Sequence, residues 1–64
     1  MCELNAYITG REGREELYLE SVDIIRPEAD SVYLKSLFGE EKRFPGRIKE
    51  IQAIKRKILL EQAR

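Results

Sequence analysis

The chain has 64 residues and a mass of 7.5 kDa, which allows one domain at most. It carries 12 basic and 12 acidic side chains and no histidine, so the net charge is zero and the usual acid–base residue near neutral pH is missing. Because it has one cysteine, a disulfide within the chain and a zinc finger of the Cys/His type are both excluded.

Other classes of function are disfavoured by what the sequence lacks. It has no apolar run near the ~20 residues that cross a bilayer. Acidic and polar residues begin at Glu3, which does not suit a signal peptide, so we expect a cytoplasmic protein with no membrane association. A nucleophile elbow and a phosphate-binding loop are also missing, and Cys2 has no neighbouring base. We therefore expect that the protein is not an enzyme.

The first half of the chain predicts strands. Apolar and polar residues alternate along 2–8 with the period of two of a half-buried strand, which places on one face Cys2, Leu4, Ala6 and Ile8. Gly10 and Gly13 are expected to supply positive φ in a hairpin loop. A second strand is predicted over 15–26, with Leu17, Leu19 and Ser21 on one face, and Pro27 ends it.

A third strand is predicted over 31–38, where one face carries Val32, Leu34, Ser36 and Phe38. A turn is predicted at 39–41, and residues 42–44 are expected to begin a returning strand before Pro45 and Gly46. Over 47–63 two interpretations stay open. The isoleucine spacing favours an amphipathic helix, whereas the β-branched content favours strands at 47–54 and 57–62 joined near Lys55 and Arg56.

The zero net charge conceals an asymmetry between the two halves. Residues 1–32 carry three bases against eight acids, a net of −5, and residues 33–64 carry nine bases against four acids, a net of +5. This pattern predicts ion pairs across strands, or alternatively an uneven surface, with a basic face or a dipole that favours self-association.

Several short motifs occur in an order that resembles a known family. They are Met1-Cys2-Glu3, the glycine hairpin near Gly13, the strand from Ser31 to Leu37, Leu37-Phe38-Gly39-Glu40, Pro45-Gly46-Arg47-Ile48 and Lys57-Ile58-Leu59-Leu60-Glu61. Together they resemble the CooT family, small accessory proteins associated with nickel insertion into carbon monoxide dehydrogenase. The resemblance covers essentially the whole chain.

The resemblance implies an all-β domain over residues 1–64. Its form would be a small Sm-like or SH3-like barrel, or a bent antiparallel sheet of five to six short strands. That choice makes 47–62 strand, turn, strand, although the isoleucine spacing still allows a helix. The resemblance also implies Ni(II) as the bound metal, Cys2 as its ligand, and carbon monoxide dehydrogenase or its other nickel accessory proteins as partners.

Cys2 has suitable chemistry for this role because a thiolate is a soft ligand and Ni(II) accepts nitrogen and sulfur donors in a plane. The α-amine of Met1 and the backbone amide of Cys2 would form fused chelate rings with the sulfur. A homodimer that pairs two N-termini would supply two thiolates. The competing interpretation is a buried core cysteine, since Cys2 shares the face of Leu4 and Ala6. Glu3 and Asn5 are interpreted as solvated side chains.

RNA binding is the rival function, and family members have been labelled as predicted RNA-binding proteins. Basic side chains in the second half would track a phosphate backbone, and a stacking platform would come from Tyr7, Tyr18 and Tyr33. The zero net charge argues against it, because nucleic-acid binders usually carry a basic footprint. A module that docks on a larger enzyme without metal is the remaining alternative.

Overall fold

A computed structural model describes residues 3–62. The described residues form six β-strands and one short 3-10 turn, η1, and contain no α-helix. The elements in chain order are β1 (Leu4–Thr9), η1 (Arg11–Gly13), β2 (Glu15–Pro27), β3 (Val32–Ser36), β4 (Glu41–Phe44), β5 (Gly46–Gln52) and β6 (Lys57–Gln62). The predicted all-β fold is confirmed. No helix within residues 3–62 is long and apolar enough to cross a membrane.

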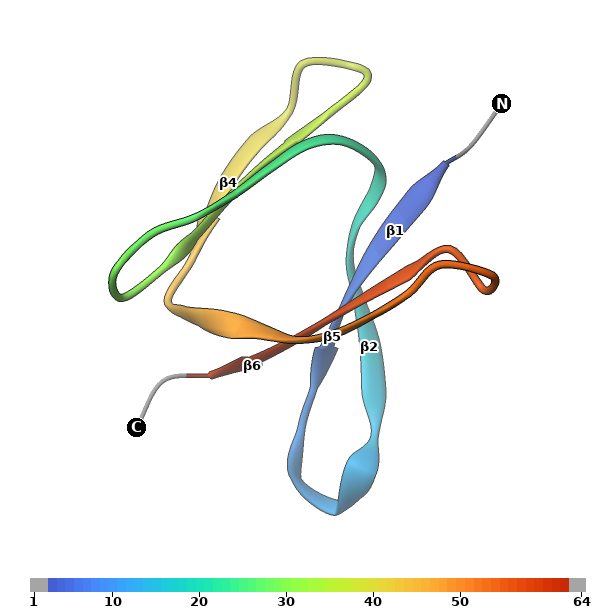
Figure 1. Cartoon of the computed structure of the whole chain (residues 1–64), viewed down its shortest axis with the longest axis vertical. Coiled ribbons are helices and arrows are strands. Elements are labelled where there is room, and N and C mark those ends of the chain that lie inside the picture. The colour runs from blue at the N-terminus through green and yellow to red at the C-terminus, as the bar shows by residue number, and fades with distance from the viewer. Residues whose placement is uncertain (1–2, 63–64) are drawn as a thin grey trace.

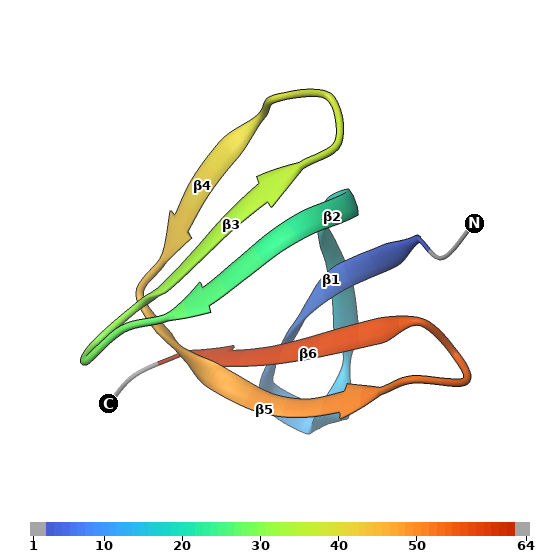
Figure 2. The same ribbon diagram turned by 45° about the horizontal axis from the view of Figure 1, so that its top comes forward.

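All six strands belong to one strongly bent, unclosed sheet with the order β4-β3-β2-β1-β6-β5 (Figures 1 and 2). Four of the five pairings are antiparallel, and the pairing of β1 with β6 is parallel. The expectation of an antiparallel sheet did not include that parallel pair. It places the first strand of the chain in the middle of the sheet, beside the last one.

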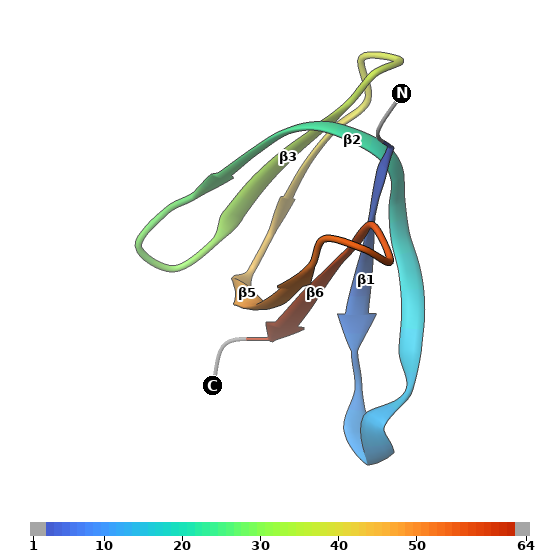
Figure 3. The ribbon, with the colours of Figure 1, turned by 45° about the vertical axis from the view of Figure 1, so that its right-hand side comes forward.

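The bend of the sheet is built into β2. Its first half pairs with β1, its second half pairs with β3, and the register shifts near Leu19 and between Val22 and Ile24. Ser21 lies between these shifts with a φ of +52°, which is unusual for a residue other than glycine. One long strand therefore belongs to both parts of the sheet and turns the β3–β4 part over the core (Figure 3).

The core confirms the predicted alternation where the strands are regular. Ala6 is fully buried, with Leu4 and Ile8 packed against the core, and in β3 the buried side chains are Val32, Leu34 and Ser36. The alternation fails at two places. Leu17 is 49% exposed because the register shift near Leu19 moves it off the core face, and Phe38 is 85% exposed because β3 ends at Ser36.

The C-terminal segment is strand, turn and strand, so the helical interpretation of 47–63 is wrong within the described residues. β6 runs between β1 and β5, and Ile58, Leu59 and Leu60 are all buried. The isoleucine spacing combines residues of β5, the turn and β6, and Ile51 and Ile54 are exposed rather than part of a buried helix face. The connecting turn needs no glycine, because Arg56 adopts a φ of +57° and its N–H donates to the Ala53 carbonyl at 3.1 Å.

Backbone geometry explains why glycine is needed at two positions, Gly13 and Gly46. Gly13 has a φ of +75°, as predicted, but Gly10 is extended and Glu12 adopts the other positive φ of the hairpin loop. Gly46 lies where the chain passes from β4 to β5. A Cβ there would collide with the Glu61 carbonyl oxygen and lie 2.6 Å from the Phe44 ring, so only glycine fits without movement.

Candidate functional site

The predicted metal ligands Met1 and Cys2 lie outside the described residues. The described chain starts at Glu3, which is exposed as predicted, and enters β1 at Leu4. Leu4 is paired with Val22 of β2, and Asn5 is paired with Lys57 of β6. The candidate site therefore borders a strand that is held on both sides, in the middle of the sheet.

Asn5 is a structural residue, and its prediction as a solvated side chain is wrong. Its Oδ1 accepts a hydrogen bond from the Ser21 N–H at 3.0 Å, and its own N–H donates to the Arg56 carbonyl at 3.0 Å. The Ser21 carbonyl in turn accepts from the Leu37 N–H at 2.8 Å. These bonds join the start of β1, the bend of β2, the β3–β4 turn and the β5–β6 turn.

The two turns lie toward the same end of the molecule as the start of β1 (Figure 2). They carry exposed apolar side chains: Leu37 and Phe38 on the β3–β4 turn, and Ile54, which is 96% exposed, on the β5–β6 turn. These side chains lie on the two turns that hydrogen bonds connect, directly or through Ser21, to Asn5 at the start of β1.

Metal ligands within residues 3–62 are sparse. No group of three or more Cys, Asp or Glu side chains in this range is arranged to hold a metal ion, and the sequence has no histidine. Ni(II), a borderline Lewis acid, is bound well by nitrogen and thiolate donors. A nickel site in this chain would therefore need Cys2 and donors that come from its neighbourhood or from a second copy.

Each of the three tyrosine rings contacts other side chains of the chain. Tyr18 packs edge-to-face on Phe44 with ring centroids 5.4 Å apart, and Lys42 Nζ lies 4.6 Å from its ring centre. Lys57 Nζ lies 5.2 Å from the centre of the Tyr7 ring. Two guanidinium groups approach the Tyr33 ring: the Cζ atom of Arg26 lies 5.1 Å from the ring centre and that of Arg43 lies 5.7 Å from it. Each ring is engaged within the chain, as the interpretation of the tyrosines as cross-strand partners requires.

The charge asymmetry of the sequence becomes ion pairs, as one of its two interpretations predicted. Glu28 of the acidic half pairs with Arg43, and Glu15 pairs with Lys57 at 2.8 Å. The hydrogen bond from Lys57 lowers the pKa of Glu15 below its ordinary value, and the same bond raises the pKa of Lys57. Two further pairs lie inside the basic half, between Arg47 and Glu61 and between Lys42 and Glu40.

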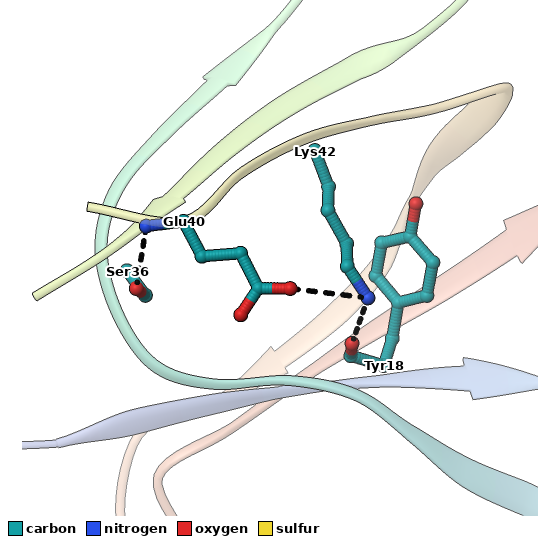
Figure 4. Close-up of polar contacts among 4 residues, drawn as sticks. All are labelled: Tyr18, Ser36, Glu40 and Lys42. Atoms are coloured by element: carbon teal, nitrogen blue, oxygen red, sulfur yellow. Dashed lines mark hydrogen bonds and ion pairs between the residues drawn. The ribbon is translucent and has the colours of Figure 1, made fainter. Parts of the chain in front are cut away.

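One contact had no signal in the sequence. Lys42 of β4 donates from Nζ to the backbone carbonyl of Tyr18 at 3.0 Å and also approaches Glu40 at 3.8 Å (Figure 4). On the turn beside it, the Ser36 hydroxyl oxygen accepts hydrogen bonds from the N–H groups of Phe38 and Glu40. The contact depends on the bend of β2, which brings Tyr18 near residues more than 20 positions away in the chain.

Comparisons with known proteins agree with this fold. Residues 1–61 match the model of a family described as "CO dehydrogenase accessory protein CooT". An uncharacterized protein of Methanocaldococcus jannaschii, MJ1551, is 39% identical over 61 residues, which is 95% of this chain and 98% of that protein. A crystal structure assigned to CooT from Carboxydothermus hydrogenoformans is 35% identical and superimposes with a TM-score of 0.87, covering 98% of this chain and 100% of that one. The chain belongs to the CooT family of carbon monoxide dehydrogenase accessory proteins.

Proposed function

We propose that this protein is a cytoplasmic nickel-binding accessory protein that helps to supply Ni(II) to carbon monoxide dehydrogenase. The observation that carries the proposal is the family match, which spans residues 1–61 and so includes Cys2. The recipient of the metal would be the dehydrogenase itself or another of its nickel accessory proteins. Nickel is cargo in this account, and the protein has no catalytic step of its own.

Cys2 is the anchor ligand in this proposal because the chain offers no other thiol. Its thiolate, the α-amine of Met1 and the deprotonated amide of Cys2 would form two fused chelate rings. Ni(II) accepts such nitrogen and sulfur donors in a planar arrangement. If Met1 is removed, the amine of Cys2 forms a single five-membered ring with its own sulfur. In both forms Cys2 is the ligand on which affinity depends.

A second copy of the chain is a natural source of the missing ligands. The described residues contribute no cluster of metal ligands, so one chain supplies few donors. Pairing two N-termini would bring two thiolates to one metal ion. Leu37 of the β3–β4 turn and Ile54 of the β5–β6 turn are exposed and would be available to such a dimer. A site with few ligands at an accessible terminus also exchanges its metal readily, as delivery requires.

The proposal is tested by titrating the metal-free protein with NiCl₂ and following the sulfur-to-metal charge-transfer absorption. The expected result is a saturable band in the intact protein that is lost in Cys2→Ser. Glu3→Gln is the matched control, because Glu3 is the adjacent exposed side chain and its loss should leave the band unchanged. Unchanged affinity and absorption in Cys2→Ser would overturn the proposal.

A further inference from the structure

The first half of β2 has one free edge. β1 pairs with residues 15–22 on one side, but the pairing with β3 begins only at Val22. Within residues 3–62, no strand pairs with the other side of residues 15–20. Figure 3 shows this part of β2 as the outer border of the sheet, beside β1 and with no strand beyond it.

The backbone of this edge presents hydrogen-bonding groups outward. The Gly10 N–H donates to the Arg14 carbonyl at 2.8 Å, which fixes the hydrogen-bonded positions of the β1–β2 ladder. Hydrogen-bonded positions alternate with non-bonded ones, so the backbone N–H and C=O groups of Glu16 point toward β1. Glu15 and Leu17 direct their N–H and C=O groups away from it. Unpaired groups of this kind are a template for an added strand.

A groove runs along the same edge. It has a volume of about 360 Å³, and β2 and the β3–β4 turn form its walls, which consist of Leu17, Tyr18, Leu19, Glu20, Ser36, Phe38 and Glu40. Leu17 is 49% exposed and Phe38 is 85% exposed, so both side chains can contact apolar side chains of a bound segment. Lys42 lies at the groove, where its ammonium donates to the Tyr18 carbonyl (Figure 4). A lysine at a sheet edge discourages indiscriminate strand pairing.

The charge beside the groove is acidic. Glu20 and Glu40 line the groove and are exposed, and Glu16 is a further exposed carboxylate of the same strand. The cation nearby, Lys42, is engaged with Tyr18 and Glu40. An extended guest strand would turn every second side chain into the groove, toward Leu17 and Phe38, and the others toward the opposite face, which carries Glu16. Charge complementarity therefore selects a guest with basic residues alternating with apolar ones.

We propose that the free edge of β2 binds an extended basic segment of a partner protein by strand addition. The partner's backbone pairs with Leu17 and Glu15, its apolar side chains fill the groove beside Phe38, and its lysines or arginines face the carboxylates. This mode of recognition takes affinity from main-chain hydrogen bonds and selectivity from alternate side chains. It uses none of the residues of the proposed nickel site and does not depend on metal.

The test is a titration of metal-free, isotope-labelled protein with a blocked peptide of alternating lysine and valine, followed by amide NMR. The expected result is saturable shifts confined to residues 15–20 and 36–42. The matching peptide of alternating glutamate and valine should bind at least about tenfold more weakly, which corresponds to about 1.4 kcal/mol. Shifts spread over the surface, no shifts, or equal binding of the two peptides would overturn the proposal.

Substitutions at and away from the groove test whether the peptide binds at the free edge of β2. The double variant Leu17→Ser and Phe38→Ser should weaken the lysine–valine peptide about tenfold, whereas Ile54→Ser, another exposed apolar position, should not change it. Lys42→Met should strengthen binding because it frees the Tyr18 carbonyl. Cys2→Ser should bind normally, which separates this proposal from the nickel site. Concentration-dependent shifts that join β2 to β5 without peptide would assign the edge to a second copy and overturn it.

Discussion

Asn5 Oδ1 accepts a hydrogen bond from the Ser21 N–H at 3.0 Å, across 16 positions of sequence. Ser21 is the residue with positive φ at which β2 bends, and its N–H is partly buried. Asn5 thereby satisfies a backbone donor that the bend removes from the ladder. It also fixes the start of β1, three positions after Cys2.

Asn5→Ala should reduce the free energy of unfolding by about 1–3 kcal/mol, because it leaves the Ser21 N–H without an acceptor. Asn5→Asp keeps an oxygen at the same position and should retain most of the stability at neutral pH. Urea unfolding of the three proteins followed by circular dichroism provides the comparison. Equal stability of Asn5→Ala and the parent protein would contradict the role given to this bond.

Gly46→Ala should be among the most damaging single substitutions. Its Cβ would collide with the backbone carbonyl of Glu61 and lie 2.6 Å from the Phe44 ring and 3.0 Å from the Gln62 Cα, so backbone must move. Overpacking of this kind costs about 1–3 kcal/mol or more. Gly10→Ala is the matched control, since its nearest neighbour would be at an ordinary 3.9 Å. Thermal unfolding should separate the two variants, and equal midpoints would contradict the steric account.

The Glu15–Lys57 pair should contribute to stability only between two pH limits. The lowered pKa of Glu15 makes its contribution present above the ordinary value of 4.5 and lost as the pH falls through the folded-state pKa. The raised pKa of Lys57 makes its contribution present below 10.5 and lost as the pH rises through the folded-state pKa. Both groups lie at the surface, so salt should weaken the effect.

Glu15→Gln tests this expectation. The stability difference from the parent protein should be present at about pH 7 and vanish at about pH 2, where the carboxyl is protonated in both states. Glu16→Gln is the control, because Glu16 makes no ion pair within residues 3–62. A difference that persists in acid would mean that Glu15 acts through packing rather than charge.

Single-stranded RNA should not bind appreciably, even at low ionic strength. The rings of Tyr7, Tyr18 and Tyr33 are each approached by cations of the chain itself, and Arg43 is also paired with Glu28. Bases would have to displace these contacts before stacking. Fluorescence anisotropy with labelled polyuridine gives the measurement. Binding that falls steeply with salt and is lost in Tyr33→Ala would support the RNA-binding alternative instead.

Sequence periodicity predicted the strands best where each strand keeps one register. The alternation of Val32, Leu34 and Ser36 in β3 is an example, since β3 has no bulge. In β2 the same reasoning misplaced Leu17, because the register shift near Leu19 changes which face each residue occupies. A bulge depends on pairing with a strand elsewhere in the chain, and periodicity within one segment carries no information about it.

The C-terminal segment shows a second limit. Ile48, Ile51, Ile54 and Ile58 have helical spacing, yet Ile51 and Ile54 are exposed and Ile58 is buried in the centre of the sheet. The position of β6 between β1 and β5 decides which residues are buried. That position is a property of the whole topology, and here the family resemblance supplied it where local propensity left two interpretations.

The candidate site was likewise only partly predictable from the sequence. Cys2 could be singled out from the sequence, because it is the one thiol of the chain and lies at the position that the family resemblance implies. Asn5 could not, because its function depends on Ser21 and Arg56, which fold back from distant parts of the chain. The free edge of β2 has the same origin, since it arises where one long strand leaves one partner for another.

Native mass spectrometry of the metal-free protein would show whether Cys2 binds nickel. The protein would be titrated with Ni(II) beside Cu(II), Zn(II) and Co(II), with Cys2→Ser in parallel, and the masses would also report Met1 retention and the oligomeric state. Our account predicts stoichiometric nickel uptake, one ion per monomer or per dimer, that is lost in Cys2→Ser. No nickel uptake by the intact protein, or equal uptake by the variant, would contradict it.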